Sequence, residues 1–158
     1  MPITQLDHYS TRSTDVPACI TFYGKALGFV PGPRPNFPFP GAWLYRADAQ
    51  GTPTGEALVH LIGVDPDDAA GLSAYLGDKA QAQPQMGTGA LDHIAFQADG
   101  LAAMYANLQA NGMPFRERRV PGMALHQLFL QDPCGVTLEL NYSAAADLAA
   151  ADAQARAA

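Results

Sequence analysis

A repeated tripeptide constrains the fold of this chain more than any other feature. Leu-Asp-His occurs at residues 6–8 and again at residues 91–93, an offset of 85 residues. Each copy is followed by a polar interruption and then by an amphipathic helix pattern, DVPACITFYGKALGF in the first half and DGLAAMYANLQANGM in the second. Both patterns end at a glycine, Gly28 or Gly112, which suits a helix terminus. Internal similarity at a fixed offset predicts one structural unit that occurs twice.

Two further pairs of segments follow nearly the same offset. WLYRAD at residues 43–48 resembles LFLQD at 128–132, and ALVHLIG at 57–63 resembles VTLELNY at 136–142. Apolar and polar residues alternate in these segments, as they do in half-buried strands. Each half is therefore predicted to contain a strand, a helix and three strands. The predicted strands lie near residues 3–10, 28–32, 41–48 and 55–63, and near 90–98, 114–119, 124–131 and 136–142.

The length of 158 residues suits a single domain, residues 1–158, of the α+β class. Within it we expect a first βαβββ module at residues 1–63 and a second at 90–142, in tandem and with the helices outside. The linker at 64–89 has the composition of a loop with a short helix near 69–76. Residues 143–158 form a tail or a helix packed on a partner, and the sequence leaves both alternatives open.

Composition excludes several classes of function. Apolar residues make up 48%, which is enough for a core, and a net charge of −6 disfavours binding to nucleic acid. No apolar run reaches the roughly 20 residues that span a bilayer, and the first 30 residues show no secretory pattern. Two cysteines, Cys19 and Cys134, are too few for a disulfide framework. We therefore expect a cytoplasmic protein without membrane or nucleic-acid partners.

The repeat also pairs the histidines. His8 and His93 occupy equivalent positions in the two halves, and the alignment of ALVHLI with VTLELN places His60 opposite Glu139. A lone strand histidine is usually a core or surface residue, but three imidazoles and a carboxylate at paired inward positions are costly to bury without a shared purpose. A divalent metal offsets that cost. Two histidines and one carboxylate are typical of non-haem Fe(II) sites, and imidazole also suits zinc, nickel and manganese.

Five segments together resemble the vicinal-oxygen-chelate superfamily: QLDHYS, FYGKALGF, ALVHLI, LDHIAF and FLQDPCGVTLEL. The superfamily includes glyoxalase I, methylmalonyl-CoA epimerase, fosfomycin-resistance proteins, bleomycin-binding proteins and type I extradiol dioxygenases. The resemblance covers residues 3–142 and implies two βαβββ modules that form a cupped, partly closed mixed sheet around a metal. It implies the metal ligands His8, His93 and Glu139, and a homodimer that acts on a small molecule.

Subfamilies differ at the position of His60, which favours extradiol ring cleavage because dioxygenases of this type use a histidine there for proton transfer. We therefore predict an Fe(II)-dependent dioxygenase that acts on a small catecholic substrate, with His60 and His126 as catalytic residues. His126 is alternatively a solvent-facing strand residue. Phe129 stands where the extradiol signature has tyrosine, which weakens this prediction. The alternatives are a glyoxalase- or epimerase-like lyase or isomerase with Mn, Ni, Co or Zn bound to all four residues, and a non-catalytic drug-binding protein.

A proline-rich stretch at residues 31–45, PGPRPNFPFPGAWLY, predicts a stiff, extended connection. Such a loop could line an aromatic pocket in which Arg34 pairs with a substrate carboxylate. A structural crossover with a surface arginine explains the same residues, and both interpretations stay open. The residues predicted to contact the substrate are Arg34, Asn36, Trp43, Tyr45, Phe129 and Tyr142.

Overall fold

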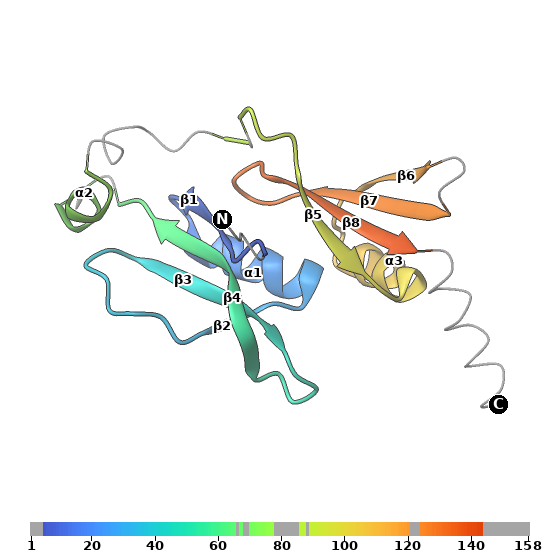
Figure 1. Ribbon diagram of the computed structural model, residues 1–158, viewed down its shortest axis with the longest axis horizontal. Helices are drawn as coiled ribbons and strands as arrows, with labels where there is room; N and C mark the ends of the chain where they lie inside the picture. Colours follow the sequence, from blue (N-terminus) through green and yellow to red (C-terminus); the bar gives the residue numbers. More distant parts are fainter. Residues whose placement is uncertain are drawn as a thin grey trace. The chain divides into compact units, whose positions relative to one another are not determined.

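The computed structural model describes residues 5–65, 67, 70–77, 86–87, 89–120 and 124–143 (Figure 1). The chain divides into two compact units, Met1–Gln85 and Met86–Ala158. Each unit contains a four-stranded sheet in which the first strand pairs in parallel with the last and the other neighbours are antiparallel. The tandem repeat in the sequence is therefore a repeat of structure.

The first unit has the order strand, helix, three strands and helix. Its elements are β1 (Tyr9–Ser13), α1 (Val16–Leu27), β2 (Val30–Gly32), β3 (Gly41–Ala47), β4 (Pro53–Gly63) and α2 (Ala70–Leu76). The strands lie in the order β1-β4-β3-β2. Helix α1 contacts β2, β3 and β4 and so covers one face of this sheet.

Local signals in the sequence explain where α1 begins and ends. The side chain of Asp15 accepts a hydrogen bond from the backbone N–H of Ala18 at 2.9 Å, and Pro17 lies in the first turn. The helix ends at Gly28, which has a φ of 68°. A side chain at that φ would be strained, so glycine is the residue that lets the chain turn back into β2. The sequence predicts Asp15 as the cap and Gly28 as the stop of this helix, and both are confirmed.

Alternation along β3 and β4 gives the first sheet one apolar and one functional face. Leu44, Val59 and Leu61 are at most 1% exposed and lie on the face that α1 covers, and Cys19 and Tyr23 of α1 are fully buried. The neighbouring side chains along each strand point the opposite way because successive residues of a strand alternate between faces. That opposite face carries the residues of the first half of the candidate site.

The second unit has the order strand, helix and three strands. Its elements are β5 (Ile94–Ala98), α3 (Leu101–Ala110), β6 (Arg116–Val120), β7 (Leu125–Gln131) and β8 (Thr137–Ser143). Its strands lie in the order β5-β8-β7-β6. Leu128, Leu138 and Leu140 of the sheet and Leu108 of α3 are at most 2% exposed and form the core.

The predicted α+β fold of two βαβββ modules is confirmed, but the first strand of each module begins later than predicted. The expected ranges were residues 3–10 and 90–98, whereas β1 is Tyr9–Ser13 and β5 is Ile94–Ala98. Thr11 and Ser13 belong to β1 and are buried although both are polar. The Ser13 hydroxyl accepts a hydrogen bond from the backbone N–H of Asp15, which compensates its burial.

The linker and the tail are described only in part. The helix expected near residues 69–76 is present as α2, and most of the remaining linker lies outside the described residues. The predictions for the tail also fall outside them, except that β8 runs to Ser143. Among the described residues, no helix is both long enough and apolar enough to cross a bilayer.

Candidate metal and substrate site

Three rings form a stack on the face of the first sheet opposite α1. Trp43 and His60 are directly opposite each other in the antiparallel pair of β3 and β4, so both side chains lie on that face. Their ring centroids are 4.0 Å apart with an angle of 3° between the planes. The centroid of the His8 ring lies 3.7 Å from that of His60. The structure therefore brings His8 and His60 together within the first unit.

The aspartate of each Leu-Asp-His copy contacts the histidine that follows it. His8 Nδ1 lies 2.5 Å from an Asp7 carboxylate oxygen, and His93 Nδ1 lies 2.8 Å from one of Asp92. An ionised carboxylate only accepts hydrogen bonds, so Nδ1 is the donor in both contacts. The other ring nitrogen, Nε2, then carries the lone pair in the neutral ring. Metal-binding histidines are commonly oriented in this way by a carboxylate.

His60 is held in its neutral form by its surroundings. Burial is the largest cause that lowers its pKa from 6.5 to about 4, and the neighbouring His8 lowers it further, while Asp7 acts in the opposite direction. At neutral pH the ring is therefore uncharged. Neutral imidazole is the form that can accept a proton or bind a metal.

Hydrogen bonds from two amides orient Glu139 in the second unit. The carboxylate is buried, and its Oε1 accepts hydrogen bonds from Gln127 Nε2 and Asn141 Nδ2, each at 2.8 Å. Arg118 Nε donates in turn to Gln127 Oε1 at 2.8 Å. These side chains share one face of the sheet because Gln127 pairs with Asn141 across β7 and β8. The network leaves Oε2 of Glu139 as the oxygen that faces His93.

The atoms His93 Nε2 and Glu139 Oε2 face each other at 3.3 Å. With Nδ1 as the donor to Asp92, a neutral His93 would point a lone pair at the carboxylate oxygen, and two acceptors repel at this distance. A proton or a metal ion between them removes that repulsion. The donor set, an imidazole nitrogen and an oriented carboxylate oxygen, fits a divalent transition metal.

Each unit therefore presents a part of the predicted site. His8 and His60 lie together in the first unit, and His93 and Glu139 lie together in the second. Among the described residues, no single group of three or more histidine, cysteine or acidic side chains is placed to hold a metal ion. The contacts that the structure shows are those within each of these two pairs.

Two predicted site residues lie on the other face of the second sheet. His126 and Tyr142 are directly opposite each other across β7 and β8. His126 is three residues from Phe129, and an odd separation on a strand puts the side chains on opposite faces. Its Nε2 lies 3.1 Å from the Tyr105 hydroxyl of α3, and Tyr142 is completely buried. We therefore leave both residues out of the proposed site.

The proline-rich loop folds around its own arginine. The guanidinium of Arg34 lies 4.9 Å from the ring centroid of Phe37 and 5.1 Å from that of Phe39, and Nη2 donates to the Phe39 carbonyl at 3.0 Å. Asn36 is exposed. The hydroxyl of Tyr45 donates to the carbonyl of Pro33 at 2.6 Å. These contacts favour the structural interpretation of the loop, while the ring of Trp43 stacks on that of His60.

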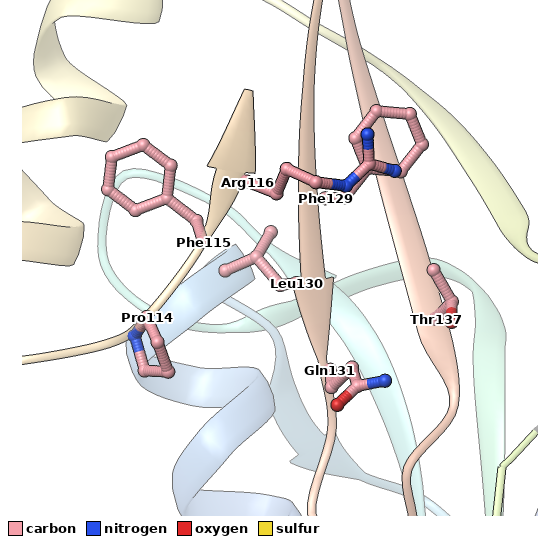
Figure 2. A pocket seen from close by; sticks show the side chains of 7 residues that line it. All are labelled: Pro114, Phe115, Arg116, Phe129, Leu130, Gln131 and Thr137. Atoms are coloured by element: carbon pink, nitrogen blue, oxygen red, sulfur yellow. The ribbon is translucent and has the colours of Figure 1, made fainter. Parts of the chain in front are cut away.

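Phe129 lies between the candidate pair of the second unit and a pocket. Its ring meets that of His93 edge to face, with 6.3 Å between centroids. It is also directly opposite Glu139 across β7 and β8 and opposite Arg116 across β6 and β7. The pocket beside it has a volume of about 350 Å³ and is lined by residues of the second unit alone (Figure 2).

Several residues of the site were not predicted from the sequence. Four of them orient the candidate ligands: Asp7, Asp92, Gln127 and Asn141. The aspartates were visible in the repeat itself, where the repeated element is Asp-His and not histidine alone. Gln127 and Asn141 lie at even separations from Phe129 and Glu139, so alternation placed them on the same face.

Two modules of this order, each with a histidine immediately before its first strand, define the class of protein. The family model described as the Glyoxalase/Bleomycin resistance protein/Dioxygenase superfamily matches residues 5–140. The chain belongs to this superfamily, which includes metalloenzymes, and the resemblance to the vicinal-oxygen-chelate proteins is confirmed.

Known relatives agree with this assignment. A protein of Arabidopsis thaliana named Glyoxylase I 4 is 29% identical over 142 residues, which cover 87% of this chain and 70% of that protein. A structure from Bacillus anthracis, described as a glyoxalase family protein, has a TM-score of 0.63 at 17% identity. The match covers 90% of this chain and 98% of that chain. Lactoylglutathione lyase from Agrobacterium tumefaciens has a TM-score of 0.58 at 15% identity, with 92% and 98% covered. At these identities the solved structures show the shared fold alone.

Proposed function

We propose that this chain is a metal-dependent lyase or isomerase of the glyoxalase type, with one divalent ion bound by His8, His93 and Glu139. The observation that carries the proposal is the pair of facing acceptors, His93 Nε2 and Glu139 Oε2, at 3.3 Å. The contacts described for His8 and His93 each lie within one unit. That a single ion binds ligands from both units is the proposal. The named relative Glyoxylase I 4 supports the lyase class.

When bound, a divalent ion would act as a Lewis acid on two neighbouring oxygen atoms of the substrate. The residues of the chain supply the remaining functions. Gln127 and Asn141 hold the Glu139 carboxylate in one orientation. His60, neutral at physiological pH, accepts a proton from a substrate carbon and returns it to the neighbouring carbon. Its stacking between Trp43 and His8 fixes the plane in which its nitrogens lie.

Metal binding by the full-length protein tests the ligand set. With Zn²⁺ and a competing chromophoric chelator, we expect one ion per chain. His8→Ala and Glu139→Gln should each weaken binding by more than about 100-fold, because each removes a ligand of the same ion. His126→Gln is the matched control, since it removes a histidine from the opposite face of the second sheet. If His8→Ala leaves Zn²⁺ binding unchanged, the two units do not share an ion.

Turnover tests the reaction class. The substrate is the hemithioacetal formed from a 2-oxoaldehyde and a thiol, and its conversion to a thioester is followed by absorbance. We expect His60→Ala to retain bound metal while turnover falls by about 100-fold or more, because removal of a proton-transfer group affects the chemical step. If this variant instead loses the metal, His60 is a metal ligand in the wild-type protein. Metal-loaded protein without activity on any hemithioacetal would contradict the lyase proposal.

Fe(II)-dependent extradiol cleavage of a catechol is the second candidate. The imidazole at residue 60 favours it, because its uncharged ring beside His8 suits transfer of a phenolic proton. Oxygen uptake and a yellow product on addition of catechols to the Fe(II)-loaded protein would establish this reaction. Phe129, which has no hydroxyl to donate, counts against it. Tight binding of a drug without turnover would favour the remaining alternative, a sequestering protein.

The proposal includes a homodimer in the cytoplasm that acts on a small molecule. It rests on the family, many of whose members act on small molecules as dimers, and on the low number of cysteines. Sedimentation equilibrium of the metal-loaded protein measures the mass directly. A monomer at micromolar concentration would contradict the dimer.

A further inference from the structure

Strand β6 concentrates positive charge in an acidic chain. Its sequence is Arg-Glu-Arg-Arg-Val, so it holds three of the nine basic residues of a chain with a net charge of −6. Alternation places Arg116 and Arg118 on the same face as Glu139, and Glu117 and Arg119 on the face toward α3. Two arginines therefore lie on the functional face of the second sheet.

Arg116 is held over an aromatic ring. Its guanidinium carbon lies 4.1 Å from the centroid of Phe129, on the strand next to it (Figure 2). The phenyl ring is buried, whereas Arg116 is exposed. This cation–π contact orients the guanidinium, and its N–H groups point outward in the plane of the group.

The charge of Arg116 has no carboxylate partner in the part of the chain that the structure describes. Two other arginines, in contrast, already donate hydrogen bonds to acceptors of the chain. Arg34 donates to the carbonyl of Phe39, and Arg118 donates to Gln127. An oriented guanidinium without an acceptor is suited to bind an anion from outside the chain.

The pocket beside Arg116 has the size and lining of a small-molecule site. Its volume of about 350 Å³ lies near the lower end for ligand pockets. Among the described residues that line it, Arg116 is the only charged one. Pro114 and Phe129 give it apolar walls, and Gln131 and Thr137 add an amide and a hydroxyl. Figure 2 shows the Arg116 side chain extending across the pocket toward Phe129.

We propose that Arg116 binds the carboxylate of a substrate whose small apolar body occupies this pocket. Phe129 separates Arg116 from the His93–Glu139 pair and contacts both sides. A molecule anchored at Arg116 in this pocket would therefore lie beside that pair, with the ring of Phe129 between them. The position of the reacting end rests on the proposed function, whereas binding of the carboxylate does not.

A pair of probes of equal size tests the proposal. The ¹⁹F signals of 4-fluorobenzoate and 4-fluorobenzamide are titrated with the full-length protein, as purified. We expect benzoate to bind and benzamide to bind at least about tenfold more weakly, because only the former has a charged acceptor for arginine. Arg116→Gln should weaken the binding of benzoate by about the same factor and leave the binding of benzamide unchanged.

Two variants make the test specific. Arg119→Gln removes the same charge from the same strand but from the opposite face, so benzoate binding should be unchanged. Arg116→Lys keeps the charge but loses the planar fork, and binding should be intermediate. Equal binding of benzoate by the wild-type protein and Arg116→Gln would overturn the proposal, as would equal loss in Arg119→Gln.

Glu139→Gln separates this proposal from the proposed function. The variant should lose the metal but keep benzoate binding, because Arg116 and the pocket stay intact. Loss of benzoate binding in Glu139→Gln would place the anion on the metal and overturn the role of Arg116. Benzoate binding that depends on Arg116 in a protein without lyase activity would support the pocket while contradicting the reaction class.

Discussion

Asp92 shows how one exposed carboxylate influences the chemistry of the ring beside it. Its contact with His93 Nδ1 at 2.8 Å fixes which ring nitrogen carries the proton. The other nitrogen is then available to a cation at Glu139. The side chain of Asp92 is 95% exposed, so it adds little to the packing of the unit. Its removal should therefore affect metal binding more than folding.

We expect Asp92→Ala to lower Zn²⁺ affinity about tenfold, because loss of an orienting partner leaves the histidine free to rotate and to change tautomer. Competition with a chromophoric chelator measures the affinity, and thermal unfolding checks that the fold is retained. Asp99→Ala is the control, since it removes another exposed acid just beyond β5. Equal effects of the two substitutions would mean that charge alone is responsible.

At the scale of elements, helices α1 and α3 are held in place by different means. Helix α1 has the Asp15 cap, whereas α3 begins at Gly100 without a side-chain cap. Instead, the Tyr105 hydroxyl of α3 donates to Glu117 of β6 and lies 3.1 Å from His126 Nε2 of β7. Burial and the hydrogen bond to Glu117 raise the pKa of Tyr105 to about 12, so the hydroxyl keeps its proton. This cluster joins α3 to the sheet.

Tyr105→Phe should therefore loosen α3 selectively. We expect amide hydrogen exchange in α3 to become about fivefold faster, which corresponds to about 1 kcal/mol, the usual contribution of a hydrogen bond. The phenyl ring preserves the contact with Phe115, so packing should change little. Amides of α1 are the internal control because that helix belongs to the other unit. Unchanged exchange in α3 would show that packing alone holds it.

The sequence predicted the interiors of the elements better than the ends of the strands. Alternation in β4 and β8 and the cap of α1 were evident in the sequence because each depends on neighbours along the chain. The ends of β1 and β5 were not. Ser13 belongs to β1 because Gly63 of β4 lies beside it, and such pairing across the sheet leaves no local signal.

For the molecule as a whole, the lowered pKa of His60 couples stability to pH. Above pH 6.5 the ring is neutral in both the folded and the unfolded chain, so it contributes no pH dependence. Between pH 6.5 and about 4 the unfolded chain binds a proton that the folded chain does not. The free energy of unfolding should therefore fall as the pH is lowered through this range.

Urea unfolding of metal-free protein at several pH values between 4 and 7 measures this contribution. Solvent screening of the partly exposed ring reduces it, and we expect about 1 kcal/mol. His60→Gln is the reference because it has the same carboxylates as the wild-type protein. Protonation of carboxylates also lowers stability in acid, and this contribution is common to both proteins. The wild-type protein should lose more stability than His60→Gln between pH 6.5 and 4. Parallel pH profiles would contradict a lowered pKa.

The sequence by itself determined the tandem βαβββ order and the equivalence of His8 with His93, because these follow from periodicity and repetition along the chain. The tertiary structure decided which side chains share a face and a partner. It placed His126 against Tyr105 and Arg116 over Phe129, where the described residues offer the guanidinium no carboxylate. Such contacts depend on strand register and on neighbours distant in sequence, and a shift of one residue would reverse every face.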